Sequence, residues 1–378
     1  MEVRWQSLHC IYLICQILDH GQGGPRALVH KLPKNLKFIL LWTPWSLGTL
    51  NDFGHLGEAQ DSFIYNNCSV IDCYVTADRH FFGSDLSRFD AIAFSGRNIT
   101  TADLPATRYP HQKYLFLSTE SSENYPVCEE EFDGFFNWTS TYKLKSDIPF
   151  AYISTRNAAG EVVGPKVDMH WDKVEFSNVK EEEFIYNLWK SKRKAAAWFV
   201  SNCGPSRSER EHFVKQLQDA LQKYGWTIDI YGDCGTLQCP KSIHNQCVNL
   251  LQNNYFFYMA LENSFDEDYV TEKVLTALWY NIIPIVYGGA NYSRFLPPSS
   301  FLNGRDYTPE ALARAMDHYI KSGREYVQFF KWHSHYTYYS LSLAENVCAL
   351  CSALNDRNKV ETVTVYDHFR EAKKRLRE

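Results

Sequence analysis

The chain has 378 residues, of which 39 are Lys or Arg and 44 are Asp or Glu, so its formal net charge is -5 at pH 7. A general nucleic-acid binder carries a strongly basic face, so this balance predicts that nucleic acid is not a partner. Apolar residues make up 45% and aromatic residues 15% of the chain, which is enough for sizeable cores, and the length predicts two domains.

The first apolar run, from Leu8 to Leu18, contains His9 and Gln16. It is shorter than the roughly 18 apolar residues that a membrane-spanning helix needs. Two interpretations stay open: the run is part of a signal peptide or of a shortened membrane anchor, or it is a soluble helix. We therefore set residues 1–34 apart as an N-terminal segment that holds the remnant of a signal anchor or stem.

Short strand-like runs fill the first half of the chain, at residues 37–42, 71–76, 91–94 and 114–117, and Gly, Asp, Ser and Pro residues separate them. The polar, glycine-bearing stretch that follows, residues 156–176, is interpreted as a passage between two domains. The first domain is therefore expected to span residues 35–165.

The second half of the chain alternates between strand and helix patterns. Strands are predicted at 195–200, 227–231, 255–261 and 282–286, and helices at 206–223 and 270–279. Continuous apolar strands between helices are typical of a parallel sheet covered on both faces, so the predicted fold class is α/β. The second domain is expected to span residues 166–350. Residues 351–378 are predicted to form a helical tail with a basic, amphipathic end.

A cluster of polar residues that ends at Lys273 follows the strand predicted at 255–261. In open parallel sheets, ligands bind beyond the carboxyl ends of the strands. The next helix is predicted to begin near Asp268 or Thr271, where its N-terminal N–H groups would bind a phosphate. Lys273 would then lie in the first turn, which is unfavourable for a cation unless an anion binds there. An alternative stays open, in which Asp268 is an N-cap and Glu272 and Lys273 lie on a solvated face.

Eleven cysteines are present, an odd number that leaves at least one thiol outside any disulfide within the chain. Cys348 and Cys351 form a CxxC motif, but a zinc site usually needs a second such pair or a nearby pair of histidines. Disulfides are therefore favoured over zinc, and they indicate the secretory pathway. Candidate N-glycosylation sequons begin at Asn67, Asn98, Asn137 and Asn291.

Residues 255–289, YFFYMALENSFDEDYVTEKVLTALWYNIIPIVYGG, resemble the signature of the α1,3-fucosyltransferases, glycosyltransferase family 10. That signature has Phe-Glu-Asn-Ser, a few residues, Asp-Tyr-Val-Thr-Glu-Lys, and an apolar strand that ends in Gly. Leu261 stands where the family usually has Phe. Residues 135–153, 198–217 and 229–235 resemble further segments of the family, so the likeness covers residues 36–351. The stretch YGDCGTLQCPKS is most similar to invertebrate members.

The resemblance implies a GT-B-like fold, in which two Rossmann-like domains face each other across a cleft. The C-terminal domain would bind the donor GDP-fucose, and the N-terminal domain would bind a glycan or glycoprotein acceptor. The implied reaction is inverting transfer of fucose to a GlcNAc of an N-glycan or related glycoconjugate, without a cofactor or a catalytic metal. The likeness to invertebrate members favours the core GlcNAc. The implied location is the Golgi lumen, as a type II membrane protein with an N-terminal anchor in the full-length chain.

Inverting transfer needs a general base on the acceptor hydroxyl and groups that stabilise the leaving GDP. Glu120 follows the strand at 114–117 and matches the family's catalytic Glu, so it is the predicted base. The family's Glu-Ser-Pro reads Glu-Ser-Ser here, and Glu123 is a nearby competitor. Glu272 is the second predicted catalytic residue, because it would steady the positive charge that develops on fucose. The resemblance assigns GDP-fucose binding to Arg210, Asn263, Tyr269, Glu272 and Lys273.

The resemblance also implies two disulfides that join Cys348 and Cys351 to Cys68 and Cys73, in either pairing. Some pairing is expected among Cys203, Cys234, Cys239 and Cys247, and Cys128 is predicted to stay outside the disulfides.

Other functions stay open. Asp266-Glu267-Asp268 reads as a DxD motif, which holds a divalent metal in GT-A sugar transferases, although here it is interpreted as loop composition plus an N-cap. The chain could also be an inactive glycan-binding homologue, which the presence of Glu120, Arg210 and Lys273 disfavours. Arg210, preferred to Arg207 by its place on the predicted helix, has the alternative of an exposed surface arginine.

Overall fold

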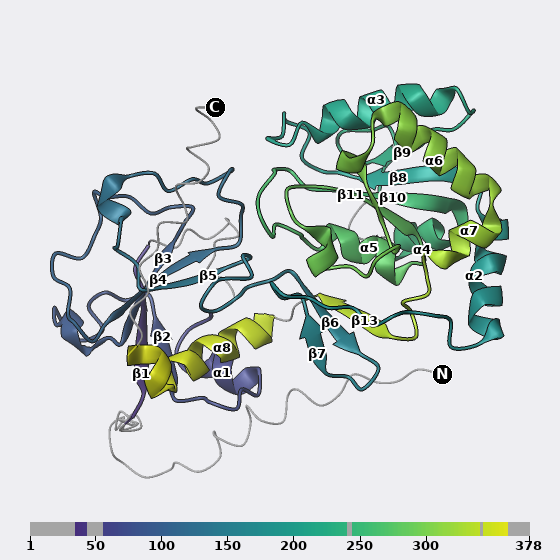
Figure 1. Cartoon of the computed structure of the whole chain (residues 1–378). Coiled ribbons are helices and arrows are strands. Elements are labelled where there is room, and N and C mark those ends of the chain that lie inside the picture. The colour runs from purple at the N-terminus through teal and green to yellow at the C-terminus, as the bar shows by residue number, and fades with distance from the viewer. Residues whose placement is uncertain (1–34, 44–55, 240–243, 341–342, 362–378) are drawn as a thin grey trace, which may run out of the picture. The chain divides into compact units, whose positions relative to one another are not determined.

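The computed structural model describes residues 35–43, 56–239, 244–340 and 343–361 (Figure 1). The predicted N-terminal segment and the basic end of the predicted tail lie outside the described residues. By its internal contacts the chain divides into Met1–Leu36 and Lys37–Glu378, and every element below belongs to the second unit. Within the described ranges, no helix is both long enough and apolar enough to cross a membrane.

The first sheet, as far as the chain is described, has five parallel strands in the order β2-β1-β3-β4-β5. Their bounds are β1 Lys37–Leu41, β2 Cys73–Thr76, β3 Ala91–Ser95, β4 Lys113–Ser118 and β5 Trp138–Thr141. The first four strands confirm the four predicted runs. The sequence pattern did not indicate β5, because three of its four residues are Ser or Thr and it has no apolar alternation.

The two faces of the first sheet have different covers. One face packs against α1 (Asp61–Tyr65) and α8 (Leu343–Asn355), for example through Phe63 and Leu350. The other face packs against loops and short 3-10 helices that are rich in phenylalanine, including Phe89. This sheet therefore departs from the layering of helices on both faces, because aromatic rings from loops fill one layer.

The second sheet has the order β12-β11-β10-β8-β9, and its strands are again parallel. The strands are β8 Lys194–Phe199, β9 Ile228–Tyr231, β10 Tyr255–Leu261, β11 Ile283–Tyr287 and β12 Leu302–Asn303. The helices are α3 Arg210–Gln222, α4 His244–Asn254, α5 Lys273–Trp279 and α6 Pro309–Lys321. In Figure 1, α3 and α6 cover one face of this sheet while α4 and α5 cover the other. The predicted α/β class is confirmed.

Strand β10 shows why the second sheet needs both helical layers. All seven of its residues are buried. Phe257 and Met259 pack in the cluster with α3 and α6, whereas Tyr258 and Ala260 pack in the cluster with α5. Because successive side chains of a strand point to opposite faces, an uninterrupted apolar run requires cover on both sides.

A third, antiparallel sheet has the order β13-β6-β7, with strands β6 Ile153–Asn157, β7 Val162–Gly164 and β13 Tyr336–Ser340. The stretch 156–176, interpreted as a passage between two domains, begins with the end of β6 and contains β7, and the interpretation itself stays a prediction. The partner of β6 is β13, far along the sequence, and a local pattern does not indicate such a distant pairing.

The remaining helices in the described ranges are α2 Val179–Ser191, α7 Gly323–Gln328, α9 Arg357–Glu361 and the 3-10 turns at 86–88, 130–132, 292–294 and 304–306.

Two helices begin later than predicted. Helix α3 begins at Arg210, because Glu209 before it has a left-handed φ of 52°. Helix α5 begins at Lys273, and Asp268 has a left-handed φ of 61°, which an α-helix does not accommodate. The prediction that Asp268 starts or caps this helix is therefore wrong. Its carboxylate instead accepts hydrogen bonds from the N–H of Leu144, at 3.2 Å, and from Arg294, at 2.9 Å.

Helix α8 connects the end of the described chain to the first sheet. Its residues Val347 and Leu350 pack in the core of that sheet, although the predicted second domain includes them. The predicted domain boundaries at 165 and 350 stay predictions.

Disulfides join α8 to the region around β2, which confirms the predicted pairing of Cys348 and Cys351 with Cys68 and Cys73. The disulfides among the described residues are Cys68–Cys348, Cys73–Cys351, Cys203–Cys234 and Cys239–Cys247, and Cys128 takes part in none of them.

The four candidate glycosylation asparagines differ in exposure. Asn67, Asn98 and Asn291 are exposed. Asn137 is half-buried, and its Oδ1 accepts a hydrogen bond from the N–H of Tyr114 at 2.9 Å. Modification at all four positions stays a prediction.

We expect the two disulfides Cys68–Cys348 and Cys73–Cys351 together to stabilise the fold more than Cys239–Cys247 does. They join residues 280 and 278 apart, whereas Cys239–Cys247 joins residues 8 apart. Either long-range disulfide alone closes nearly the same loop, so both must be removed for the loop to open. In the chain-entropy description, a longer closed loop restricts the unfolded chain more, so removing both should cost at least about 3 kcal/mol more free energy of unfolding than removing Cys239–Cys247. Equilibrium denaturation of the quadruple and the double Cys→Ala variants, without reductant, measures this difference. Equal losses would contradict the expectation.

Candidate active site

Two loops at the carboxyl ends of parallel strands carry most of the predicted site residues. The β4 loop, residues 119–124, follows the first sheet's strand β4 and carries Glu120. The β10 loop, residues 262–272, follows the second sheet's strand β10 and carries Asn263 and Tyr269. The two loops touch, because the Tyr269 hydroxyl donates a hydrogen bond to Glu120 Oε2 at 3.2 Å. Parallel sheets bind their ligands at such strand ends.

Glu120 also lines an open pocket of about 420 Å³. Arg210 and Asn263 line the same pocket, so the structure brings together three of the predicted site residues. A pocket of this size can hold a small-molecule ligand. The lining residues are Glu120, Asn124, Tyr125, Asn202, Gly204, Pro205, Ser206, Arg207, Arg210 and Asn263.

Both carboxylate oxygens of Glu120 have a donor. Arg97 Nη2 lies 2.9 Å from Oε1, and Tyr269 donates to Oε2. Each oxygen retains a second lone pair that can accept another proton or hydrogen bond. Reasoning from sequence missed Arg97. A usable signal existed, because Arg97 follows β3, the neighbour of β4 in the sheet, so both residues lie at the same edge.

Tyr152 is a second residue that sequence reasoning missed. Its hydroxyl donates a hydrogen bond to the carbonyl of Thr119, directly before Glu120. Burial, together with the negative charges of Glu120 and Glu272, raises the pKa of Tyr152 far above its ordinary value. The hydroxyl therefore stays protonated at neutral pH and keeps its role as a donor to the β4 loop.

Arg210 is buried, with 5% of its surface exposed, so the alternative of an exposed surface arginine is wrong. Its Nη1 donates to the carbonyl of Leu261 at 3.0 Å, and its Nη2 donates to the carbonyl of Asn202 at 3.4 Å. The guanidinium thus joins the end of β10 to the loop after β8 while it lines the pocket. Arg207 also lines the pocket and is exposed.

Lys273 lies in a cluster of buried polar groups at the start of α5. Its Nζ donates to Glu262 Oε2 at 3.0 Å and to Thr271 Oγ1 at 2.7 Å. Glu262 is 2% exposed, and its Oε1 also accepts from the N–H of Thr271. Burial lowers the pKa of Lys273, but the carboxylates of Glu262 and Glu272 outweigh this and hold the pKa above its ordinary value. The cation therefore has a partner within the protein, and the solvated-face alternative is wrong for Lys273.

The remaining predicted residues lie around this cluster. Tyr269 is 2% exposed, and burial raises the pKa of its hydroxyl far above the ordinary value. Glu272 is exposed, with its Oε1 at 3.9 Å from Lys273 Nζ, so its carboxylate is accessible. Asn263 is half-buried, and its carbonyl accepts a hydrogen bond from the N–H of Ser208. That bond attaches the β10 loop to the segment before α3.

The two aspartates of the DxD-like motif already have donors from the protein. Asp266 accepts hydrogen bonds from Ser122 and Tyr142, and Asp268 accepts from Leu144 and Arg294. The carboxylates that would bind a metal in a DxD motif therefore already accept hydrogen bonds from within the protein. In the described ranges, no group of three or more His, Cys, Asp or Glu side chains is arranged to hold a metal ion.

The glycine pair after β11 permits a close approach of the β10 loop. A Cβ at Gly289 would lie 2.5 Å from the backbone nitrogen of Asp266 and 2.7 Å from the carbonyl carbon of Phe265. No side chain fits at such distances. The backbone of Gly289 therefore packs directly against the chain's own β10 loop.

Replacing Lys273 by Met should destabilise the protein, because Glu262 would stay buried without its cation. We expect a loss of about 1–3 kcal/mol in the free energy of unfolding. Adding Glu262→Gln should recover part of that loss, since no buried carboxylate is then left uncompensated. Lys173→Met is the matched control, because Lys173 pairs with Glu175 at the surface and their side chains are 88% and 53% exposed, so it should lose roughly 0.5 kcal/mol or less. Denaturant unfolding measures all three, and a control loss as large as that of Lys273→Met would refute the account.

Comparison with known proteins covers both halves of the chain. Residues 34–153 match the family profile described as "Fucosyltransferase, N-terminal", and residues 189–370 match "Glycosyltransferase family 10 (fucosyltransferase) C-term". Alpha-(1,3)-fucosyltransferase C of Drosophila melanogaster is 35% identical over 352 residues, which cover 89% of this chain and 77% of that protein. The 4-galactosyl-N-acetylglucosaminide 3-alpha-L-fucosyltransferase FUT6 of Pan troglodytes is 30% identical, over 93% of this chain and 87% of its own.

A crystal structure of an alpha1,3-fucosyltransferase with GDP-fucose aligns with 90% of this chain and 95% of its own, at 14% sequence identity and a TM-score of 0.48. The two family profiles match most of the chain, and the Drosophila melanogaster relative shares more than a third of the aligned residues. The chain therefore belongs to glycosyltransferase family 10, the fucosyltransferases.

Proposed function

We propose that this protein is an inverting α1,3-fucosyltransferase that transfers fucose from GDP-fucose to a GlcNAc hydroxyl of a glycan or glycoprotein. The observation that carries the proposal is that side chains from both sheets line one and the same pocket. The carboxylate of Glu120 comes from the loop after a strand of the first sheet, and the cations of Arg207 and Arg210 come from the segment after a strand of the second sheet. Relatives named as α1,3-fucosyltransferases, aligned over both halves, support the linkage.

Glu120 is the proposed general base. It would take the proton of the acceptor hydroxyl as that oxygen attacks C1 of fucose on the face opposite to GDP, so the bond to GDP breaks and the anomeric centre inverts. Arg97 and Tyr269 hold the two carboxylate oxygens in place, and Tyr152 fixes the backbone just before them. A base needs this kind of support, because proton transfer depends on the position of the receiving oxygen.

The leaving GDP gains negative charge, which fixed cations must meet. Arg210 is the proposed principal contact, because it is held rigidly by Leu261 and Asn202 at the wall of the pocket. Lys273, the first residue of the helix that follows the β10 loop, is proposed to add positive charge there. Asn263 and Tyr269 are proposed to contact the donor, and the exposed carboxylate of Glu272 to face the positive charge that develops on the fucose ring.

The acceptor is proposed to be the core GlcNAc of N-glycans. The names of the relatives include both a 4-galactosyl-N-acetylglucosaminide transferase and a glycoprotein transferase, so antennary and core acceptors both belong in the assay. Incubation of the enzyme with GDP-fucose and a panel of defined acceptors, followed by linkage analysis with mass spectrometry, tests the proposal. An α1,3-linked product on core GlcNAc supports it, and a product on antennae alone would replace the acceptor assignment.

We further propose that the protein works in the Golgi lumen, anchored as a type II membrane protein in its full-length form. The disulfides among the described residues and the exposed sequon asparagines Asn67, Asn98 and Asn291 support an oxidising, glycosylating compartment.

Glu120→Gln should lower kcat for fucosyl transfer by about 10²–10⁴-fold, because the base is lost while the shape of the side chain is kept. The affinity for GDP should be unchanged, as measured by calorimetry. Glu123→Gln is the matched control, since Glu123 lies in the same loop and accepts from the N–H of Phe265 rather than lining the pocket. It should keep far more activity. Normal transfer by Glu120→Gln would remove Glu120 from the role of base.

Chelation distinguishes this mechanism from a metal-dependent DxD transferase. We expect enzyme dialysed against EDTA to transfer fucose at a rate within roughly twofold of the untreated enzyme, since protein cations take the place of a Lewis acid at the diphosphate. Abolished transfer that returns on addition of a divalent cation would favour the metal-dependent alternative.

A further inference from the structure

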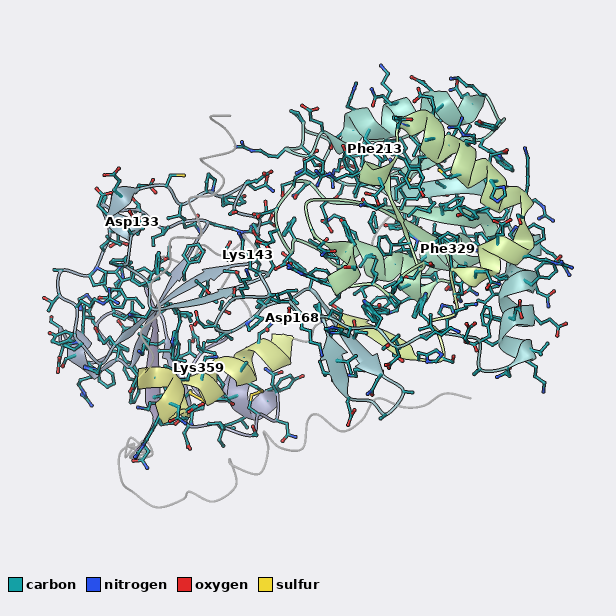
Figure 2. The ribbon with its side chains drawn as sticks, in the orientation of Figure 1. Asp133, Lys143, Asp168, Phe213, Phe329 and Lys359 are labelled. Carbon is teal, nitrogen blue, oxygen red and sulfur yellow. A yellow bond between two sulfur atoms is a disulfide. The ribbon has the colours of Figure 1, made fainter. Side chains whose placement is uncertain are left out.

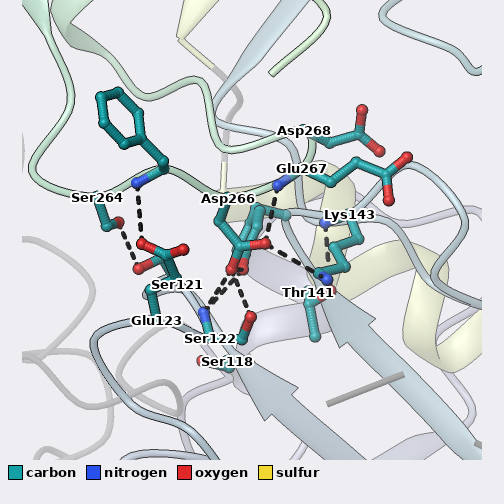
Figure 3. A network of polar contacts seen from close by, with 12 residues as sticks. Ser118, Ser121, Ser122, Glu123, Thr141, Lys143, Ser264, Asp266, Glu267 and Asp268 are labelled. Carbon is teal, nitrogen blue, oxygen red and sulfur yellow. Dashed lines mark hydrogen bonds and ion pairs between the residues drawn. The ribbon is translucent and has the colours of Figure 1, made fainter. Parts of the chain in front are cut away.

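The β4 loop and the β10 loop are joined by several buried polar contacts besides the one that involves Glu120 (Figure 3). The Ser264 hydroxyl donates to Ser121 Oγ at 2.5 Å, and both serines are fully buried. The N–H of Phe265 donates to Glu123 Oε2 at 3.2 Å. The strongest contact is at Asp266, whose side chain reaches from the β10 loop to the β4 loop.

Asp266 is 7% exposed, and its carboxylate is surrounded by donors. Oδ2 accepts from the Ser122 N–H at 2.8 Å, from the Ser122 hydroxyl at 2.5 Å and from the Tyr142 hydroxyl at 2.6 Å. Lys143 Nζ lies 3.5 Å from Oδ1. A buried carboxylate is tolerated when its oxygens are satisfied in this way, and these donors come from the β4 loop and from the segment after β5.

The position of Ser122 gives this contact its consequence. Ser122 is two residues from Glu120, and Asp266 is three residues from both Asn263 and Tyr269. Fixing Ser122 on Asp266 therefore fixes the distance between the proposed base and the proposed donor-binding residues. Small displacements at such a site lower the rate steeply, because proton transfer and attack require the reacting atoms in near contact.

We propose that Asp266 is a positioning residue for fucosyl transfer: its carboxylate fastens the β4 loop to the β10 loop and so places Glu120 against the bound donor. This inference rests on the proposed function. Asp266 thus belongs to a sequence motif that resembles a metal site, but its ligands are the hydroxyl and amide groups of its own chain. Burial raises the pKa of Asp266, but Lys143 and the hydrogen bonds of Ser122 and Tyr142 outweigh this and lower the pKa, so the carboxylate is charged at neutral pH.

The test is Asp266→Asn, which keeps the side-chain shape but turns one acceptor into a donor. We expect kcat for transfer to fall by about 10–100-fold while the Kd for GDP stays within roughly twofold, because Glu120 is displaced and the diphosphate cations are not. Asp268→Asn is the matched control: Asp268 is an equally buried carboxylate of the same loop, but its partners are Leu144 and Arg294 and not the β4 loop. It should lower kcat much less.

A double-mutant cycle separates positioning from a general loss of structure. If Asp266 acts through Glu120, adding Asp266→Asn to Glu120→Gln should lower the residual rate by less than about threefold, since the base is already absent. An Asp266→Asn effect as large in the Glu120→Gln background as in the wild type would overturn the proposal, as would an Asp266→Asn enzyme with wild-type kcat.

Tyr142→Phe is the milder variant. It removes one donor to Asp266 Oδ2 and one acceptor of the Ser122 N–H, but the bond from that N–H to Asp266 remains and the aromatic packing is kept. It should lower kcat in the same direction with GDP affinity retained, and an unchanged kcat would contradict the proposal even if Asp266→Asn fails to fold. Different outcomes overturn the proposed function and the positioning role of Asp266. Absence of fucosyl transfer by the wild type overturns the proposed function, whereas an active wild type with an equally active Asp266→Asn variant overturns the positioning role alone.

Discussion

Most of the proposed functional side chains of this protein lie on loops beyond the carboxyl ends of parallel strands, and such loops lack the backbone ladder that fixes a strand. Their geometry must come from buried polar side chains instead. Three residues do this work: Arg210 binds the end of β10 to the loop after β8, Glu262 binds the start of α5, and Asp266 binds the β4 loop. Each is charged and buried, and each has several partners, as a buried charge requires.

This constraint explains why ions of both signs lie so close together. Three cations lie near three carboxylates in this region: Arg97, Arg210 and Lys273 lie near Glu120, Glu262 and Glu272. All three carboxylates raise the pKa of Tyr152. The buried members neutralise one another, whereas Glu272 and Arg207 stay exposed. Arg210 combines both roles, because it holds two backbone segments together and also lines the pocket. Figure 2 shows the side chains on both sheets and their loops, with Lys143 labelled.

Local sequence patterns predicted the elements whose formation depends on local features. Strand β10 has the bounds expected from its apolar run, and Glu120 and Arg210 line one pocket as the family resemblance implied. The misses share a cause, which is dependence on distant residues. Strand β6 pairs with the distant β13, and the sequence pattern did not indicate this strand. Asp268 looked like a helix cap, but Arg294 and Leu144 hold it in a left-handed turn. Arg97 lies in a polar stretch and Tyr152 in a mostly apolar one, and neither stretch indicates by itself that its residue contacts Glu120 or Thr119.

The return of α8 to the first sheet affects how the chain matures during synthesis. Ile39, Ala93 and Leu115 belong to strands made early, but the layer that covers them includes Val347 and Leu350, which leave the ribosome hundreds of residues later. Until then, α1 covers only part of one apolar face of the sheet, so this half cannot complete its folding ahead of the other during synthesis. Chaperones and oxidoreductases of the secretory pathway would therefore meet a long-lived, partly uncovered intermediate, and a ribosome that stops short of α8 would release a product unable to close its first core.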